Sequence, residues 1–149
     1  MNRNNKGRSD IMIKLESKKG TVNAKQQTVY NFLTDFRNFS GLLPAEKLRN
    51  LEISNDKLKF DIDGLGTIGL VMGEKTPYSD ILIKPIDKSS TDFTLRLFIT
   101  RLQESSSVVQ ISLEANLNMF LEMMAKSPLQ QFIDLMVDKL SGFDFKEQQ

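Results

Sequence analysis

The chain has 149 residues, 40% of them hydrophobic and 26% charged, which indicates one globular domain with a substantial core. Its 20 basic and 19 acidic residues leave a net charge of +1, which argues against nucleic acid as the partner, because nucleic-acid binders usually carry a strong basic excess. The sequence contains neither Cys nor His, so thiol catalysis, a Ser-His-Asp triad and most zinc sites are excluded, and we expect no catalytic residue, no metal and no cofactor.

The first residues, 1–10, are polar and lack the apolar core of a signal peptide, so we expect a flexible N-terminal tail. No window of the sequence approaches the roughly 18 to 20 apolar residues that a membrane-spanning helix needs. We therefore expect a cytoplasmic protein without stable membrane insertion.

A strand and two short helices are predicted after this tail. Apolar and polar residues alternate at the start of 11–22, which predicts a strand. Helical spacing of apolar residues follows, and Asn23 with Gln26 resembles a capping box at the start of the first helix. The second short helix is predicted to end before Pro44, since the residue preceding a proline disfavours helical geometry.

Six strands are predicted between about residues 47 and 117. Each is a short run of alternating apolar and polar residues, and polar turns such as "SND" and "ESSS" separate the runs. This pattern is typical of an antiparallel meander with one face in water. The stretch "GLGTIG" at 64–69 matches a dinucleotide-binding fingerprint, but a strand and not a helix follows it. We interpret its glycines as turn and bulge residues.

The last predicted element is a helix over about 118–141, with Asn118 as its N-cap and Gly142 as its C-terminal stop. Pro128 is expected to bend or divide this helix. The segment "NMFLEMM" gathers three methionines, whose flexible thioethers adapt to irregular apolar surfaces. Three interpretations remain open for them: one wall of an apolar cavity, simple core packing, or an exposed patch for a protein partner or a membrane.

This order of elements is an α+β pattern that resembles the START-like superfamily, also called SRPBCC or Bet v 1-like. The stretch "TVNAKQQTVYNFLTDFRNFSGLLP" resembles the end of the first strand and the helix pair of its bacterial members. The resemblance implies a helix-grip fold, in which a curved seven-stranded antiparallel sheet wraps around a long C-terminal helix and two short helices lie between strands 1 and 2. It covers residues 11–143 as a single domain, with a C-terminal tail at 144–149.

The resemblance further implies binding or transport of a small hydrophobic molecule, lipid-like or aromatic, in a cavity between the sheet and the C-terminal helix. Two alternatives remain open: a polyketide cyclase- or dehydratase-like enzyme, which without His would need a buried carboxylate or Tyr, and a protein-interaction module that uses the Met-rich helix. An inward Asp, Glu or Tyr would favour the enzyme. Strand alternation and helical phase give the candidate ligand-binding residues, which are Phe60, Ile62, Leu70, Leu95, Leu97, Met123, Phe132 and Met136.

Five further polar residues have a functional and a structural interpretation. Asp61 and Asp63 could bind a cation, but their alternation with apolar neighbours favours a solvent-facing pair. Arg101 shares the inward side of its strand and could hold an acidic head group, whereas an Arg at a strand end more often reaches solvent. Tyr30 and Tyr78 could donate into a cavity, although a surface position is more common for tyrosine.

Overall fold

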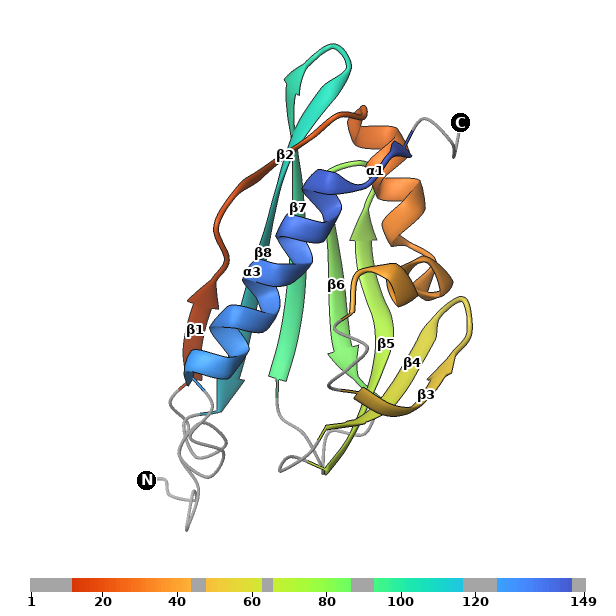
Figure 1. Cartoon of the computed structure of the whole chain (residues 1–149), viewed down its shortest axis with the longest axis vertical. Coiled ribbons are helices and arrows are strands. Elements are labelled where there is room, and N and C mark those ends of the chain that lie inside the picture. Colours follow the sequence, from red (N-terminus) through yellow and green to blue (C-terminus); the bar gives the residue numbers. More distant parts are fainter. Residues whose placement is uncertain (1–11, 44–47, 63–65, 87–92, 117–125, 146–149) are drawn as a thin grey trace.

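The computed structural model describes residues 12–43, 48–62, 66–86, 93–116 and 126–145. Figure 1 shows one curved antiparallel sheet with its helices on the concave side. In chain order the elements are β1 (Met12–Glu16), β2 (Gly20–Val22), α1 (Gln26–Leu33), the 3-10 helix η1 (Phe36–Gly41), β3 (Leu48–Ile53), β4 (Lys57–Ile62), β5 (Gly66–Thr76), β6 (Asp80–Pro85), β7 (Phe93–Gln103), β8 (Ser106–Asn116) and α3 (Lys126–Gly142).

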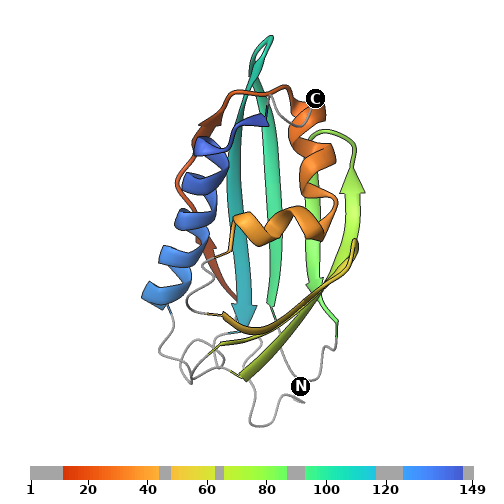
Figure 2. The same cartoon turned by 45° about the vertical axis from the view of Figure 1, so that its right-hand side comes forward.

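The strands pair in the order β1-β8-β7-β6-β5-β4-β3, and β2 pairs with β8 beyond the end of β1. Strands β3 to β7 each pair with the next strand in the sequence, whereas β1 and β2 reach across to β8. Turned by 45°, the molecule shows α3 and the α1–η1 pair over the same face of the sheet, at opposite sides of it (Figure 2). The predicted helix-grip α+β fold is confirmed, including the two short helices and the six-stranded meander.

The predicted first strand is divided into β1 and β2, and Ser17 lies at the division. Its buried hydroxyl donates to the Lys18 carbonyl at 2.7 Å and accepts from the Ile111 amide at 2.8 Å. The Ser17 amide in turn donates to the Ile111 carbonyl at 2.8 Å. The Ser17 hydroxyl thus replaces the backbone acceptor that a continuous first strand would offer to the Ile111 amide. The backbone of β8 therefore keeps its hydrogen bonds where the first strand bends away.

The predicted capping box at the start of α1 is wrong. Lys25, and not Asn23, occupies the N-cap position, and no side chain caps the helix there. The Gln26 side chain instead donates to the carbonyls of Tyr78 and Ile99, at 3.0 and 3.1 Å. One amide group thus attaches the first turn of α1 to the β5–β6 turn and to β7. A local sequence pattern does not indicate such long-range hydrogen bonds.

In the described residues α3 is continuous from Lys126 to Gly142, so Gly142 is its last residue as predicted. Pro128 lies in its first turn, where the missing N–H removes no helical hydrogen bond, and the helix is not divided beyond it. Asn118 and the three methionines of "NMFLEMM" lie outside the described residues. Within the described ranges, no helix combines the length and the hydropathy that crossing a membrane requires.

A single apolar core fills the space between the concave face and the helices. Its end near α1 is closed by three aromatic rings: Phe32 lies 4.7 Å from Phe143 and 5.1 Å from Phe145, and the rings of Phe143 and Phe145 lie 4.7 Å apart. Phe145 belongs to the segment predicted to be a C-terminal tail, yet only 1% of it is exposed. The packed part of the chain therefore includes Phe145.

Candidate ligand site

The concave face of the sheet is apolar because the inward positions of its strands carry aliphatic and aromatic residues almost without interruption. Register keeps these residues opposite one another: Phe60 of β4 pairs with Ile68 of β5, and Leu95 of β7 pairs with Leu113 of β8. The exception among the buried inward positions is Ser107. The buried hydrophobic residues at these positions are Leu15, Val22, Leu58, Phe60, Ile68, Leu70, Ile81, Ile83, Leu95, Leu97, Ile99, Val109, Ile111, Leu113 and Ala115.

Five of the predicted site residues lie together in this interior. Their exposed fractions are 2–4%, and they are Phe60, Leu70, Leu95, Leu97 and Met136. Phe132 is half-buried against the same core. The side chain of Ile62 and the whole of Met123 lie outside the described part of the chain. Side chains that line a wide, open cavity would retain more accessible surface, so at these five residues the interior is nearly filled.

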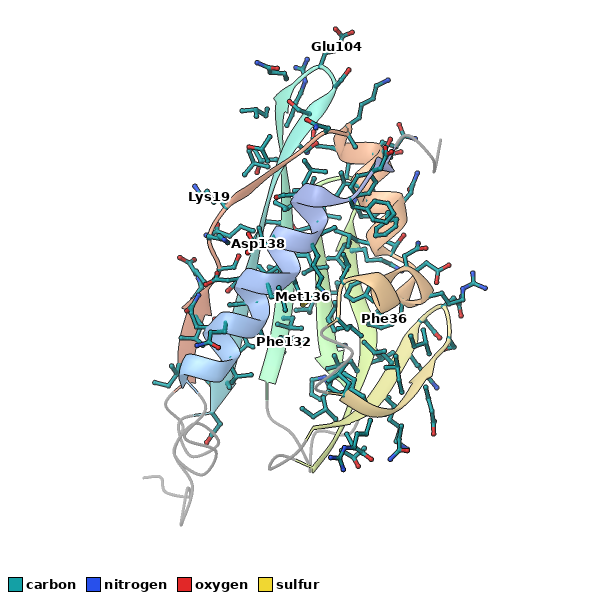
Figure 3. All side chains as sticks on the ribbon, in the orientation of Figure 1. Lys19, Phe36, Glu104, Phe132, Met136 and Asp138 are labelled. Carbon is teal, nitrogen blue, oxygen red and sulfur yellow. The ribbon has the colours of Figure 1, made fainter. Side chains whose placement is uncertain are left out.

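Half-buried apolar residues lie around the core, among them Tyr30 and Phe143 near α1 and a second group at the opposite end. Ile13, Leu48, Leu129 and Phe132 are half-buried and pack against the core. They come from the starts of β1, β3 and α3, which lie toward the same end of the molecule (Figure 1). Figure 3 shows Phe132 and Met136 on the side of α3 that faces η1 and Phe36. The partly open apolar surface is therefore continuous with the predicted site.

Polar contacts fix one side of α3 to the β1–β2 segment. The Lys18 amide donates to Asp134 at 2.8 Å, and the Gln130 side chain donates to the Glu16 carbonyl at 2.8 Å. The Lys18 ammonium pairs with Asp138 at 2.6 Å, and this hydrogen bond raises the pKa of Lys18. These bonds hold the outer side of the helix at the sheet edge, away from the interior.

Gly20 lets α3 approach β2 closely at the same edge. A Cβ atom at this position would lie 2.5 Å from Cγ1 of Val137 and would also collide with the Ser141 hydroxyl. Real Cβ atoms do not come so close to their neighbours, so a larger residue would fit here only if the Val137 and Ser141 side chains, or the helix itself, shifted. The close packing of α3 on β2 thus uses the space that a side chain at position 20 would fill.

On the side facing η1, a lysine bridges α3 to the chain that follows η1. The Lys139 ammonium donates to the Leu43 carbonyl at 3.3 Å, and its side chain is half-buried. The two residues are 96 positions apart, and the acceptor is a backbone atom. Lys139 was not among the predicted site residues, because helical phase placed it at the margin of the apolar stripe and the sequence says nothing of its acceptor.

Ionisable groups stay out of the described interior. The buried polar residues are four, Ser17, Ser107, Ser112 and Asn116, and no described Asp or Glu is buried. Ser107 donates its hydroxyl to the Ala24 carbonyl at 2.7 Å, so that group is already satisfied. Within the described ranges, no three His, Cys, Asp or Glu side chains gather in a group that could hold a metal ion.

The remaining polar candidates reach solvent, Asp61 as its alternation predicts and Arg101 although it pairs with the inward Ser107. Asp61 accepts hydrogen bonds from Thr67 at 2.6 Å and Asn50 at 2.7 Å, and these bonds lower the pKa of Asp61. Its predicted companion, Asp63, lies outside the described residues. Arg101 is exposed near the end of β7. This exposure agrees with the interpretation that an Arg at a strand end reaches solvent.

Tyr30 of α1 and Tyr78 of the β5–β6 turn contact each other. Their ring centroids lie 5.5 Å apart at an interplanar angle of 87°, an edge-to-face arrangement that stabilises the contact. Tyr30 is half-buried and Tyr78 is 43% exposed. The surface interpretation of Tyr78 is therefore confirmed.

A separate hollow of about 190 Å³ lies on the outer face of the sheet. It is shallow and mixed in character, and Arg96 at its margin pairs with Asp80 at 3.1 Å. A solvated hollow of this kind offers an apolar molecule little burial. Its lining residues are Lys14, Leu82, Thr94, Arg96, Phe98, Ser112 and Glu114.

Sheet and C-terminal helix together define a helix-grip protein with an apolar interior. No protein-family model matches the sequence, and no curated protein matches it. Solved structures do match. Norcoclaurine synthase from Thalictrum flavum, in complex with dopamine and hydroxybenzaldehyde, has a TM-score of 0.65 at 13% identity over 88% of this chain and 85% of that chain.

Two polyketide proteins are also similar in structure. The Zhui aromatase/cyclase from a Streptomyces species has a TM-score of 0.59 at 11% identity, over 87% of this chain and 94% of that chain. The di-domain aromatase/cyclase StfQ of steffimycin biosynthesis has a TM-score of 0.65 at 14% identity, over 93% of this chain and 52% of that chain. These likenesses show that the chain has the helix-grip fold that the resemblance to the START-like, or SRPBCC, superfamily predicts.

Proposed function

We propose that this protein binds a small apolar or aromatic molecule between the concave face of the sheet and α3. The observation that carries the proposal is the apolar lining that runs from β4 to β8 and continues on α3 through Phe132 and Met136. Burial of apolar surface stabilises such a complex by about 25 cal/mol per Å². The structural neighbour that holds dopamine and hydroxybenzaldehyde shows that this fold can hold small aromatic molecules.

A ligand has to displace side chains, because the lining residues are nearly filled by their own contacts. Met136 suits this role, since an unbranched thioether changes conformation at low cost. The partly exposed residues at the starts of α3 and β3, Leu129, Phe132 and Leu48, support access from that end. The bonds of Gln130 and Asp134 hold the opposite side of α3, so its inner side can yield while the helix stays seated.

A cyclase-like enzyme is the second candidate, and the two aromatase/cyclase neighbours favour it. Acid–base catalysis without His would need a carboxyl or a tyrosine in contact with the ligand. The described interior contains no buried Asp or Glu, and the half-buried Tyr30 packs against the core and against the ring of Tyr78. These observations support binding over catalysis. Protein recognition by the segment around Met123 stays a proposal that pull-downs with Met123→Ser would test.

The binding proposal is tested with N-phenyl-1-naphthylamine, an uncharged probe that fluoresces when it is buried in apolar surroundings. We expect saturable binding to the wild-type protein. Two variants make the same change on opposite faces: Phe132→Ser alters α3 at the partly open end, and Phe98→Ser alters the outer hollow. Loss of about half the burial of one phenyl ring should weaken binding about fivefold in Phe132→Ser.

Phe98→Ser should leave the affinity within about twofold of wild type, since Phe98 faces away from the proposed site. Thermal unfolding of both variants checks that each remains folded. If Phe98→Ser abolishes binding and Phe132→Ser does not, the probe occupies the outer hollow and the proposal is wrong. Native mass spectrometry of the gently purified protein, followed by solvent extraction, then identifies the natural ligand that co-purifies.

A further inference from the structure

We infer that the natural ligand is an amphipathic molecule with one anionic head group, and that Lys139 binds that group. This inference rests on the proposed function, because it places the head group at the margin of the same apolar interior. Lys139 lies in the last turn of α3. It extends toward η1, on the side of the helix opposite the bonds that attach α3 to β1 and β2.

The charges of α3 are sorted between its two sides. Asp134 and Asp138 both turn toward the β1–β2 segment, where the Lys18 amide and ammonium bind them. Lys139 is alone on the other side, and among the described residues no carboxylate lies within ion-pair distance of its ammonium. The acids that could neutralise it within the helix are thus engaged elsewhere.

The surroundings of Lys139 are apolar. Leu135 precedes it by one helical turn and so lies on the same side of the helix, and Phe143 directly follows the end of α3. Leu42 and Leu43, at the end of η1, are 1% and 3% exposed. A half-buried cation among such neighbours loses part of its hydration, and an anionic partner would compensate for the lost interactions with water.

The hydrogen-bonding capacity of Lys139 is only partly used. An ammonium group has three donors, and the described contact with the Leu43 carbonyl occupies one of them, at 3.3 Å. A carboxylate, phosphate or sulfonate that reaches this point could accept the others in charge-assisted bonds. Its apolar body would extend along Met136 and Phe132, which precede Lys139 in α3 and lie on the side of the helix that faces η1 (Figure 3). The site therefore selects for an acid and against the corresponding neutral molecule.

Two probes with the same ring system separate charge from apolar burial. 1-Anilinonaphthalene-8-sulfonate carries an anionic sulfonate, and N-phenyl-1-naphthylamine lacks it. We expect Lys139→Gln to weaken binding of the sulfonate about tenfold, the lower end of the range for a charged hydrogen bond because the ammonium is partly solvated. Binding of the neutral probe should stay within about twofold. Lys139→Arg, which keeps the positive charge, should retain most of the preference for the sulfonate.

Lys18→Gln is the matched control, because it removes the same charge from the opposite side of α3. It should leave the ratio of the two affinities unchanged. If Lys139→Gln leaves this ratio unchanged, or if Lys18→Gln lowers it equally, the head-group site is wrong while the binding proposal stands. If the folded wild-type protein binds neither probe saturably, the binding proposal and the head-group site both fail.

Discussion

Replacing Gly20 by alanine tests whether α3 lies where the site requires it. The added Cβ would lie 2.5 Å from Cγ1 of Val137, so the Val137 side chain, the helix or β2 has to move. Overpacking of this kind costs about 1–3 kcal/mol of unfolding free energy. For a domain of this size that cost lowers the melting temperature by about 2–10 °C. Thermal unfolding followed by circular dichroism or calorimetry measures the change.

Gly142→Ala is the matched control, since the added Cβ at the end of the same helix meets no atom within 4 Å. We expect this change to be neutral or stabilising by up to about 1 kcal/mol. A second comparison uses Val137→Ala, which removes the methyl group that the Cβ added in Gly20→Ala would meet. The double variant should lose less unfolding free energy than the sum of the losses of the two single variants. We expect this difference to be at least about 1 kcal/mol.

The outcome that would refute this reasoning is specific. If Gly20→Ala melts at the same temperature as Gly142→Ala, α3 does not pack on β2 as closely as described. Additivity of Gly20→Ala and Val137→Ala within about 0.5 kcal/mol would show that the two residues do not touch. Either result would also remove the geometric basis for placing Phe132 and Met136 opposite the sheet.

Three further changes have defined outcomes. Ser107→Ala should lower the unfolding free energy by about 1–3 kcal/mol, because it leaves the buried Ala24 carbonyl without its hydrogen bond. Ser106→Ala should be neutral or stabilising, because the buried Ser106 hydroxyl has no partner among the described residues. Urea unfolding of the two variants measures both effects. Thr67→Val removes a hydrogen bond that lowers the pKa of Asp61, so the wild type should be more stable than the variant at pH 7. This advantage should shrink below about pH 4 and vanish once the pH falls through the lowered pKa. Melting temperatures of both proteins, measured across this pH range, test the prediction. Phe145→Ala should cost about 3–5 kcal/mol in the same urea assay, and a cost near zero would mean that the residue belongs to a tail.

The order of elements could be predicted from the sequence because each strand shows its own alternation. Leu95 and Leu97 face inward and Arg96 faces outward, as a period of two requires. The same alternation placed Phe60 and Leu70 in the interior. Such residues are predictable because a shift of one position would expose every apolar side chain of the strand.

The features that the sequence missed depend on partners that are distant along the chain. Ser17 divides the first strand because its hydroxyl binds the Ile111 backbone, 94 residues away. The Gln26 side chain does not cap α1 as predicted but donates hydrogen bonds to carbonyls 52 and 73 residues away. Lys139 binds a backbone oxygen, which no residue type encodes. Local periodicity therefore predicts which face is buried, but it cannot predict which polar side chain bridges two elements.

The pairing of β1 and β2 with β8 has a consequence for synthesis of the protein. Each strand from β4 to β8 pairs with the strand made just before it, so most of the sheet can form as the chain emerges. β1 and β2 are made first but have no partner until β8 is complete, and α3 follows later still. Such long-range pairing slows folding and leaves β1, β2 and the apolar concave face exposed in the meantime. A ligand or a chaperone that covers this face would act before α3 closes over it.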